Sequence, residues 1–123
     1  MCKILLSIHP EHVKNIMSGK KQYEFRKVKC TKHIDKIIIY STYPVMKVVG
    51  EAEVVDIIVN TPETVWKQTA SYSGITKQFF SDYFYNHKKA IAYKLGNVKK
   101  YSKPRDLSFY GVRIAPQIGR AHV

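Results

Sequence analysis

Apolar and polar residues along the first part of the chain predict a strand, a helix and a second strand. The run KILLSI (Lys3–Ile8) is apolar and of strand length. The segment HPEHVKNIMSG has a proline in its first turn, apolar residues at helical spacing and a glycine at its exit, which is typical of a short helix. The next segment, KQYEFRK, alternates as a strand does, so Tyr23 and Phe25 share one face while Glu24 and Arg26 share the other.

The middle of the chain predicts further strands and a pair of helices. The continuous apolar run KIIIYST (Lys36–Thr42) is typical of a central strand. The segment VMKVVGEAEVVDIIV predicts two strands, Val45–Val49 and Ala52–Val59, and Gly50 between them indicates a bulge or bend. NTPETVWKQTA begins with Thr61 as an N-cap and a proline at the first helical position, and ITKQFFSDYFYNH predicts a second helix.

The last part of the chain predicts two strands and an irregular end. KKAIAYKL and VKKYSK alternate as strands on either side of a Gly-Asn pair, and KPRDLSFYGV indicates a turn with a short irregular piece. Five to six short strands, an early helix and an inserted helical pair predict an α+β fold built on a small twisted β-barrel. The length of 123 residues predicts a single domain, which we assign to residues 1–117.

The last six residues, Ile118–Val123, differ in character from the rest of the chain. Their sequence, IGRAHV, coincides with an in-frame translation of a widely used sequencing adapter. This coincidence predicts a non-native or disordered tail at residues 118–123, with a natural end lost after about Gln117, and the alternative is an ordinary polar tail. The tail is therefore left out of the fold prediction.

Charge is the strongest compositional signal in the chain. The formal net charge is +12, from 21 Lys and Arg against 9 Asp and Glu. Such an excess indicates a polyanionic partner, with nucleic acid as the leading candidate, although surface lysines also serve solubility alone. The distribution favours a partner, because 15 of the 21 basic residues fall in two segments. The first holds Lys14, Lys20, Lys21, Arg26, Lys27, Lys29, Lys32 and Lys36, and the second holds Lys88, Lys89, Lys94, Lys99, Lys100, Lys103 and Arg105.

Several classes of protein are disfavoured by what the sequence lacks. No segment reaches the roughly 20 apolar residues that would span a bilayer, and the first residues do not form a signal peptide, so we expect no membrane partner and a cytoplasmic location. No glycine-rich phosphate loop or nucleophile elbow is present, and we expect no cofactor. His9, His12 and His33 lack a nearby Cys or acidic constellation, so no metal site is predicted.

The segment SGKKQYEFRK carries the pattern G-x-K-x-x-E-x-R through Gly19, Lys21, Glu24 and Arg26. In this position, after a short strand and a helix, the pattern resembles the signature of the ASCH domain, a family of PUA-like β-barrels. Two longer segments, IIIYSTYPVMKVVGEAEV and KKAIAYKLGNVKKYSKPRDL, resemble the barrel strands and the closing strand pair of the same family. The resemblance extends over residues 3–116.

This resemblance implies a cleft beside the barrel that binds RNA or another nucleic acid, with a role in regulating transcription or translation. On a strand, Glu24 and Arg26 can form an ion pair at i and i+2, which would orient Arg26 toward a phosphate or a base edge. Lys21, at the helix-to-strand turn, is expected to add a phosphate contact. A purely structural salt bridge is the alternative. The predicted nucleic-acid-binding set is Gly19, Lys20, Lys21, Glu24, Arg26 and Lys27.

The resemblance also implies enzymatic alternatives, since some ASCH relatives are small amidohydrolases that deacylate a modified pyrimidine nucleoside and others are reported as ribonucleases. Lys21 matches the lysine of the amidohydrolases, but Glu24 occupies the position of their threonine. A carboxylate cannot replace a hydroxyl nucleophile without a change of mechanism. Lys21 and Glu24 remain catalytic candidates as a base–acid pair. A third alternative is a regulatory module that binds a small nucleoside-like ligand beside another domain.

The aromatic run FFSDYFYNH allows two interpretations. Aromatic residues at helical spacing are usually core, which we favour, and the alternative is a stacking surface for bases. We expect better stacking residues among the tyrosines elsewhere, provided that they face the cleft. These are Tyr43, Tyr93, Tyr101 and Tyr110.

Overall fold

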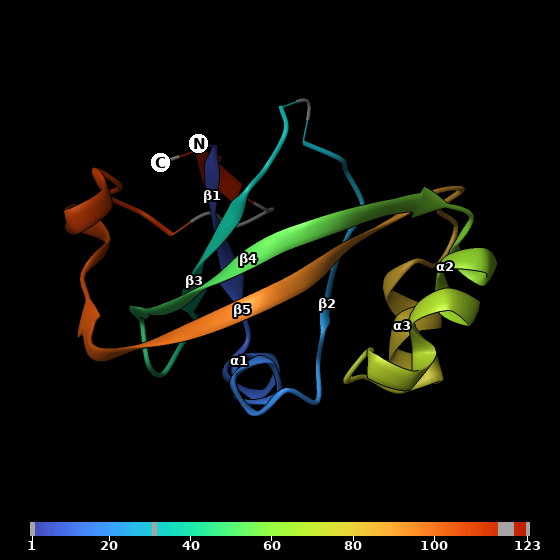
Figure 1. The fold of residues 1–123 in the computed structure, drawn as a ribbon, viewed down its shortest axis with the longest axis horizontal. Helices are drawn as coiled ribbons and strands as arrows, with labels where there is room; N and C mark the ends of the chain where they lie inside the picture. The colour runs from blue at the N-terminus through green and yellow to red at the C-terminus, as the bar shows by residue number, and fades with distance from the viewer. Residues whose placement is uncertain (1, 31, 116–119, 123) are drawn as a thin grey trace.

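The fold is a six-stranded mixed sheet with three helices, shown in Figure 1. The structure is a computed structural model, and it describes residues 2–30, 32–115 and 120–122. The strands are β1 (Lys3–Ile8), β2 (Tyr23–Arg26), β3 (Lys36–Ser41), β4 (Lys47–Asn60), β5 (Ala90–Arg105) and β6 (Arg120–His122). The helices are α1 (Pro10–Ser18), α2 (Pro62–Thr69) and α3 (Lys77–Tyr83), with single 3-10 turns η1 (Ala70–Tyr72) and η2 (Leu107–Tyr110). The α+β class predicted from the sequence is confirmed.

The N-terminal unit follows the sequence prediction closely. β1 has the predicted bounds, and α1 begins at Pro10 and ends before Gly19, whose N–H donates to the carbonyl of Ile16. β1 lies parallel to β3, so the chain between them must cross over, and it does so through α1 and β2. Val13 and Ile16 of α1 are buried and pack in the main core with residues of the sheet. In this crossover, β2 begins shortly after the C-terminal end of α1.

The two longest strands depart from the prediction. β4 and β5 each run without interruption where the sequence indicated two shorter strands. A shift of register between Val48 and Gly50 confirms the predicted irregularity in β4. The division of β5 into two strands on either side of Gly96 and Asn97 is wrong, because β5 runs through both residues. A Cβ on Gly96 would lie 2.6 Å from Cγ1 of Val55, so this glycine allows close packing against β4 inside a continuous strand.

The predicted closure of the sheet into a barrel is not seen in the described part of the chain. The strand order is β2-β5-β4-β3-β1-β6, which leaves β2 at one end of the sheet. β2 has only four residues, and its one ladder joins it to β5. Between β2 and β1 a side chain makes the connection, because Nη2 of Arg26 donates to the carbonyl of Ser7 over 3.1 Å. The opening in the sheet is therefore lined by the segment that carries the sequence motif.

The inserted helical pair covers one side of β2. Tyr23 and Phe25 belong to a buried cluster with Val65 of α2 and with Phe80 and Phe84 around α3. The predicted alternation of β2 is therefore confirmed, since its aromatic residues pack on the helices. Glu24 and Arg26 occupy the alternate positions of β2, and their side chains lie at the opening between β2 and β1.

The end of the chain bears on the predicted tail, residues 118–123. Residues Arg120–His122 pair antiparallel with β1, while residues 118, 119 and 123 lie outside the described residues. The proposal that residues 118–123 are non-native stays a prediction.

Across the described ranges, no helix has the length and apolar character that crossing a membrane would need.

Candidate functional site

Lys21, Glu24 and Arg26 line a single cavity of about 190 Å³ at the opening between β2 and β1. The turn after α1 supplies Lys21, and β2 supplies the other two. The remaining walls come from the end of β1, the first turn of α1 and the segment around α3. These residues are Ser7, Ile8, His9, His12, Ile75, Phe79 and Tyr83, and Phe25 of β2 completes the lining. The three charged residues predicted to share one cavity therefore do so.

Glu24 and Arg26 form the ion pair predicted from their i and i+2 spacing. Nη2 of Arg26 lies 2.8 Å from Oε2 of Glu24, and the Glu24 residue is only 7% exposed. Nη2 also holds the carbonyl of Ser7, so one end of the guanidinium is anchored at two points. Nε of Arg26 is buried and makes no hydrogen bond with any described residue. The guanidinium is thus fixed in place while one of its donors is left unsatisfied by the protein.

Lys21 lies deeper than the sequence suggested. Its side chain is buried, with Nζ donating to the carbonyl of Ser73 over 3.1 Å and lying 4.7 Å from the ring centre of Phe25. Gly74 has φ +69°, and a Cβ there would lie 2.4 Å from Cβ of Lys21, so the loop closes directly over this lysine. Burial lowers the pKa of Lys21, against the opposing effect of Glu24. Lys21 is an interior amine at the cavity wall, and its contact with a phosphate stays a prediction.

His12 is a part of the site that the sequence did not reveal. Its Nδ1 is buried without a hydrogen-bond partner among the residues described, and its ring meets Phe79 edge to face with centroids 5.2 Å apart. Burial, followed by the charge of Lys21, lowers the pKa of His12 below its ordinary 6.5, so the imidazole is neutral at neutral pH. Helical spacing places His12 on α1, but only the folded chain brings α3 against it. The described ranges hold no cluster of three His, Cys, Asp or Glu side chains suited to a metal ion.

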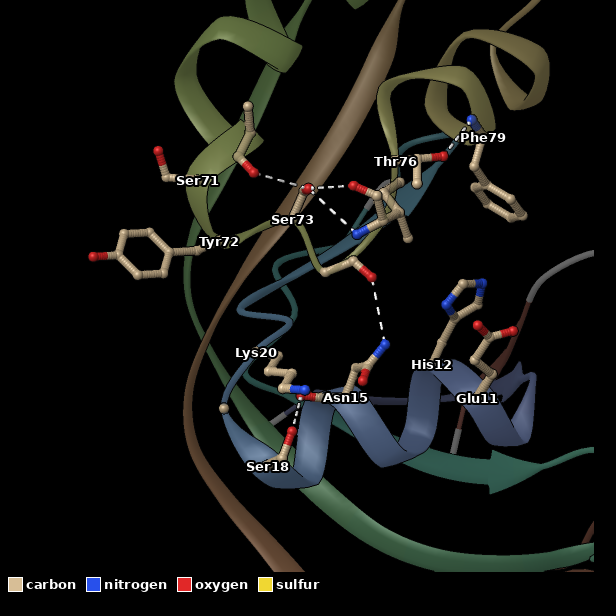
Figure 2. A pocket seen from close by; sticks show the side chains of 14 residues that line it. Glu11, His12, Asn15, Ser18, Lys20, Ser71, Tyr72, Ser73, Thr76 and Phe79 are labelled. Carbon is tan, nitrogen blue, oxygen red and sulfur yellow. Dashed lines mark hydrogen bonds between the residues drawn. The ribbon is translucent and has the colours of Figure 1, made fainter.

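A larger groove of about 770 Å³ adjoins the cavity, with His12, Ile75 and Phe79 lining both. Figure 2 shows α1 forming one side of this groove and the loop through Ser71–Thr76 forming the other. Nδ2 of Asn15 donates to the carbonyl of Gly74 over 3.4 Å and ties the two sides together. The groove therefore gives the cavity a wider approach from the surface.

The other predicted binding residues lie around this approach. Gly19 and Lys20 line the groove at the end of α1. Lys27 lines neither hollow, but its Nζ lies 4.5 Å from the ring centre of Tyr83, which lines the cavity. Five of the six predicted residues therefore line the cavity or the adjoining groove, and Lys27 lies beside a residue of the cavity wall. Their contact with nucleic acid stays a prediction.

The aromatic run divides between the two interpretations given to it. Phe80 and Phe84 are each 3% exposed and confirm the core assignment. Phe79 is 47% exposed and lines both hollows, as a stacking surface would require. Tyr93 is 1% exposed and belongs to the main core, which makes it unavailable for stacking.

Comparison with known proteins identifies the family. A family model described as "Domain of unknown function (DUF365)" matches residues 3–115. The crystal structure of ASCH from Zymomonas mobilis superposes with a TM-score of 0.85 at 30% identity, covering 94% of this chain and 83% of that one. A point variant of the same protein gives a TM-score of 0.88 at 28% identity, covering 98% and 87%. The chain belongs to the DUF365 family and is an ASCH domain.

The chain is also similar to parts of curated proteins with different names. The "ASCH domain-containing ribonuclease" of Zymomonas mobilis subsp. mobilis is 35% identical over 92 residues, which are 74% of this chain. "ATP synthase subunit alpha" of Ureaplasma parvum serovar 3 is 34% identical over 114 residues, and "Large ribosomal subunit protein uL22" of the same species is 26% identical over 114 residues. The aligned stretch spans 62% of the first relative, 14% of the second and 37% of the third, so this chain covers less than two thirds of each.

Proposed function

We propose that this ASCH domain binds RNA, with Lys21, Glu24 and Arg26 at the centre of the contact. The observation that carries the proposal is the convergence of these three side chains in one cavity, at an opening in the sheet. The net charge of +12 supports an anionic partner. The relative named as a ribonuclease supports RNA as the kind of anion.

The anchored guanidinium of Arg26 suits this role. A planar guanidinium can meet two oxygens of a phosphate, or the edge of a base, at the same time. Glu24 and the carbonyl of Ser7 hold Nη2, so the side chain loses little freedom when RNA arrives. The buried Nε is the donor for which the protein supplies no described partner. Because Nε has almost no exposed surface, RNA would contact the exposed part of the Arg26 side chain, which is 17% exposed.

The aromatic and imidazole groups give the site a surface for a base. Phe79 presents a half-exposed ring where the cavity and the groove meet, and such rings stack on unpaired RNA bases. The imidazole of His12 packs edge to face against this ring, with its Nδ1 buried. The cavity alone is smaller than the roughly 300–1,000 Å³ of common ligand sites. A nucleotide would therefore occupy the cavity together with part of the groove.

Replacing Arg26 by lysine tests the proposal without leaving Glu24 unpaired. Arg26→Lys keeps a positive charge beside the carboxylate but removes the planar fork, so we expect affinity for RNA to fall by about tenfold or more. Fluorescence anisotropy with a labelled RNA measures the dissociation constant. Lys32→Gln, which removes an exposed charge elsewhere in the same basic segment, is the matched control and should change affinity by less than about threefold. Equal losses in both variants would indicate diffuse charge attraction without a site.

The salt dependence of binding gives a second test. Release of counterions from the RNA should make affinity fall steeply as salt rises. An affinity that does not change with salt would contradict contact with the phosphate backbone. The RNA recovered from these mixtures, analysed on a denaturing gel, also shows whether it has been cut, as the name of the Zymomonas relative suggests for that protein.

A further inference from the structure

A second hollow, of about 550 Å³, lies where β5 leaves the sheet. Val48 pairs with Arg105 and Gly50 with Lys100, so two steps along β4 correspond to five along β5. The extra residues bulge out of the ladder, and Pro104 among them has no N–H to contribute to it. We call this hollow the β5 groove. It is lined by Lys99, Tyr101, Ser102, Lys103, Pro104, Arg105, Asp106, Ser108 and Phe109.

Arg105 is held between two aromatic rings in the β5 groove. Its guanidinium carbon lies 4.0 Å from the ring centre of Tyr101 and 4.7 Å from that of Phe109. Nη1 donates to the hydroxyl of Tyr110 over 2.9 Å. The other terminal nitrogen, Nη2, makes no hydrogen bond with the described residues. The guanidinium is therefore oriented by packing while part of its donor set stays open.

A chain of hydrogen bonds fixes this arrangement to the sheet. The hydroxyl of Tyr110 donates to that of Tyr101 over 3.1 Å, and Tyr101 donates to Oε1 of Glu51 over 2.9 Å. Glu51 in turn pairs with Lys36 over 2.5 Å. Glu51 makes its ion pair with Lys36, and no acidic group among the described residues forms an ion pair with Arg105. Preorganisation of this kind is typical of a binding surface, because side chains that are already held in place lose less conformational freedom when a ligand binds.

The rest of the β5 groove combines exposed cations with an exposed ring. Lys99 and Lys103 are exposed, and the one acidic lining residue, Asp106, is paired with Lys47. Phe109 is 67% exposed and belongs to none of the three buried clusters. Cations beside an exposed aromatic ring are the combination with which proteins bind single-stranded nucleic acid, because phosphates meet the charges and a base stacks on the ring.

The β5 groove is separate from the cavity lined by Lys21, Glu24 and Arg26, which we call the Lys21 cavity. The two hollows share no lining residue. In Figure 1, η2 and the end of β5 lie at one end of the longest axis of the domain, while α2 and α3 lie at the other. A ligand confined to the cavity would therefore not reach the β5 groove.

We infer that the β5 groove is a second contact for single-stranded RNA, in which Lys99, Lys103 and Arg105 hold phosphates and Phe109 stacks on a base. The inference rests on the proposed RNA-binding function and extends it, since one strand of sufficient length would engage the Lys21 cavity and the β5 groove together. An acidic peptide could also meet the three cations, but it would make no use of the exposed ring.

Affinity for RNA of two lengths tests this inference. We expect Phe109→Ala to weaken binding of a single strand of about 16 nucleotides by about tenfold, because one stacked base is lost. Binding of a strand of about 4 nucleotides, which would occupy the Lys21 cavity and the groove beside it without reaching the β5 groove, should change by less than about twofold. Phe109→Trp should keep the affinity of the parent protein for the long strand. Tyr85→Ala, which removes another exposed ring at 79% exposure, is the matched control and should have no effect.

The charge of the β5 groove gives an independent measurement on the same long strand. Lys99→Gln combined with Lys103→Gln should lower the slope of log affinity against log salt by about 1.4, or about 0.7 for each lost phosphate contact. Because both lysines and Phe109 are exposed, the variants should fold as the parent does, and circular dichroism verifies this.

The outcomes separate the two proposals. Loss of long-strand binding in Phe109→Ala, with Arg26→Lys silent, would support the β5 groove and overturn the role of the cavity. An unchanged affinity in Phe109→Ala, or equal losses for both lengths, would overturn the β5 groove while leaving the cavity to its own test. Displacement of the RNA by polyglutamate at equal charge concentration would also overturn it in favour of an acidic peptide. A parent protein that binds no RNA of either length would overturn both.

Discussion

The Lys21 cavity and the β5 groove both present cations, but they hold them in different ways. In the cavity, Lys21 and the Glu24–Arg26 pair are largely removed from solvent and depend on one another and on backbone carbonyls. In the β5 groove, Lys99 and Lys103 stay exposed, and Arg105 is positioned by rings rather than by a counter-charge. Burial makes the first arrangement costly to disturb, whereas the second can change with little effect on folding.

Because of this difference, two basic segments of similar composition need not contribute to ligand binding in the same way. Buried charges gain strong directional contacts with a ligand but require partners in its absence. Exposed charges attract a polyanion from a distance and are screened by salt. We therefore expect the cavity to determine which group is bound, and the β5 groove to add affinity for longer strands.

The largest expected effect is on stability, from removing the cation of the buried pair. Arg26→Ala would leave Glu24, which is 7% exposed, without its partner, and we expect a loss of about 3 kcal/mol in the free energy of unfolding. Urea denaturation measures this loss. Arg105→Ala is the matched control, and its loss should be much smaller because no buried carboxylate depends on it. Adding Glu24→Gln to Arg26→Ala should recover part of the stability, and similar losses in the two single variants would contradict the contrast.

The next effect separates binding from stability at Lys21. Burial lowers the pKa of this lysine, which shows that its charged form is disfavoured by the fold. Lys21→Met keeps the apolar stem and removes the desolvated charge, so we expect the melting temperature to change by less than about 3 °C. Affinity for RNA should nevertheless fall by about tenfold, as anisotropy would show. A large loss of stability without loss of affinity would mean that Lys21 serves the fold alone.

The smallest expected effect is the pH dependence that His12 contributes. Its pKa is below 6.5 in the folded protein, so the unfolded chain takes up this proton first as pH falls. The contribution of His12 to stability is therefore complete above about pH 6.5 and is lost as pH falls through the lower folded value. His12→Asn should reduce the drop in melting temperature between pH 7 and pH 5. His33→Asn, at an exposed position, is the control, and an equal reduction there would argue against a special environment for His12.

Local sequence patterns predicted most of the elements and the centre of the site. β1 and the starts of α1 and α2 follow from runs, caps and prolines that act within a few residues. The period of two in β2 was enough to pair Glu24 with Arg26 and to turn Tyr23 and Phe25 away from them. The glycines in β4 and β5 were harder to interpret, since Gly96 serves a close approach to Val55 that only the paired strands create.

By itself, the sequence determined the α+β class, the ASCH motif and the large positive charge, because propensity, periodicity and composition are properties of neighbouring residues. Only the tertiary structure decided that Lys21 is an interior amine, that His12 and Phe79 join the cavity, and that the end of β5 bulges into a groove around Arg105. These features depend on contacts between segments far apart in the chain, such as Lys21 with Ser73 and Val48 with Arg105. Burial and strand register arise from such contacts, and no local pattern encodes them.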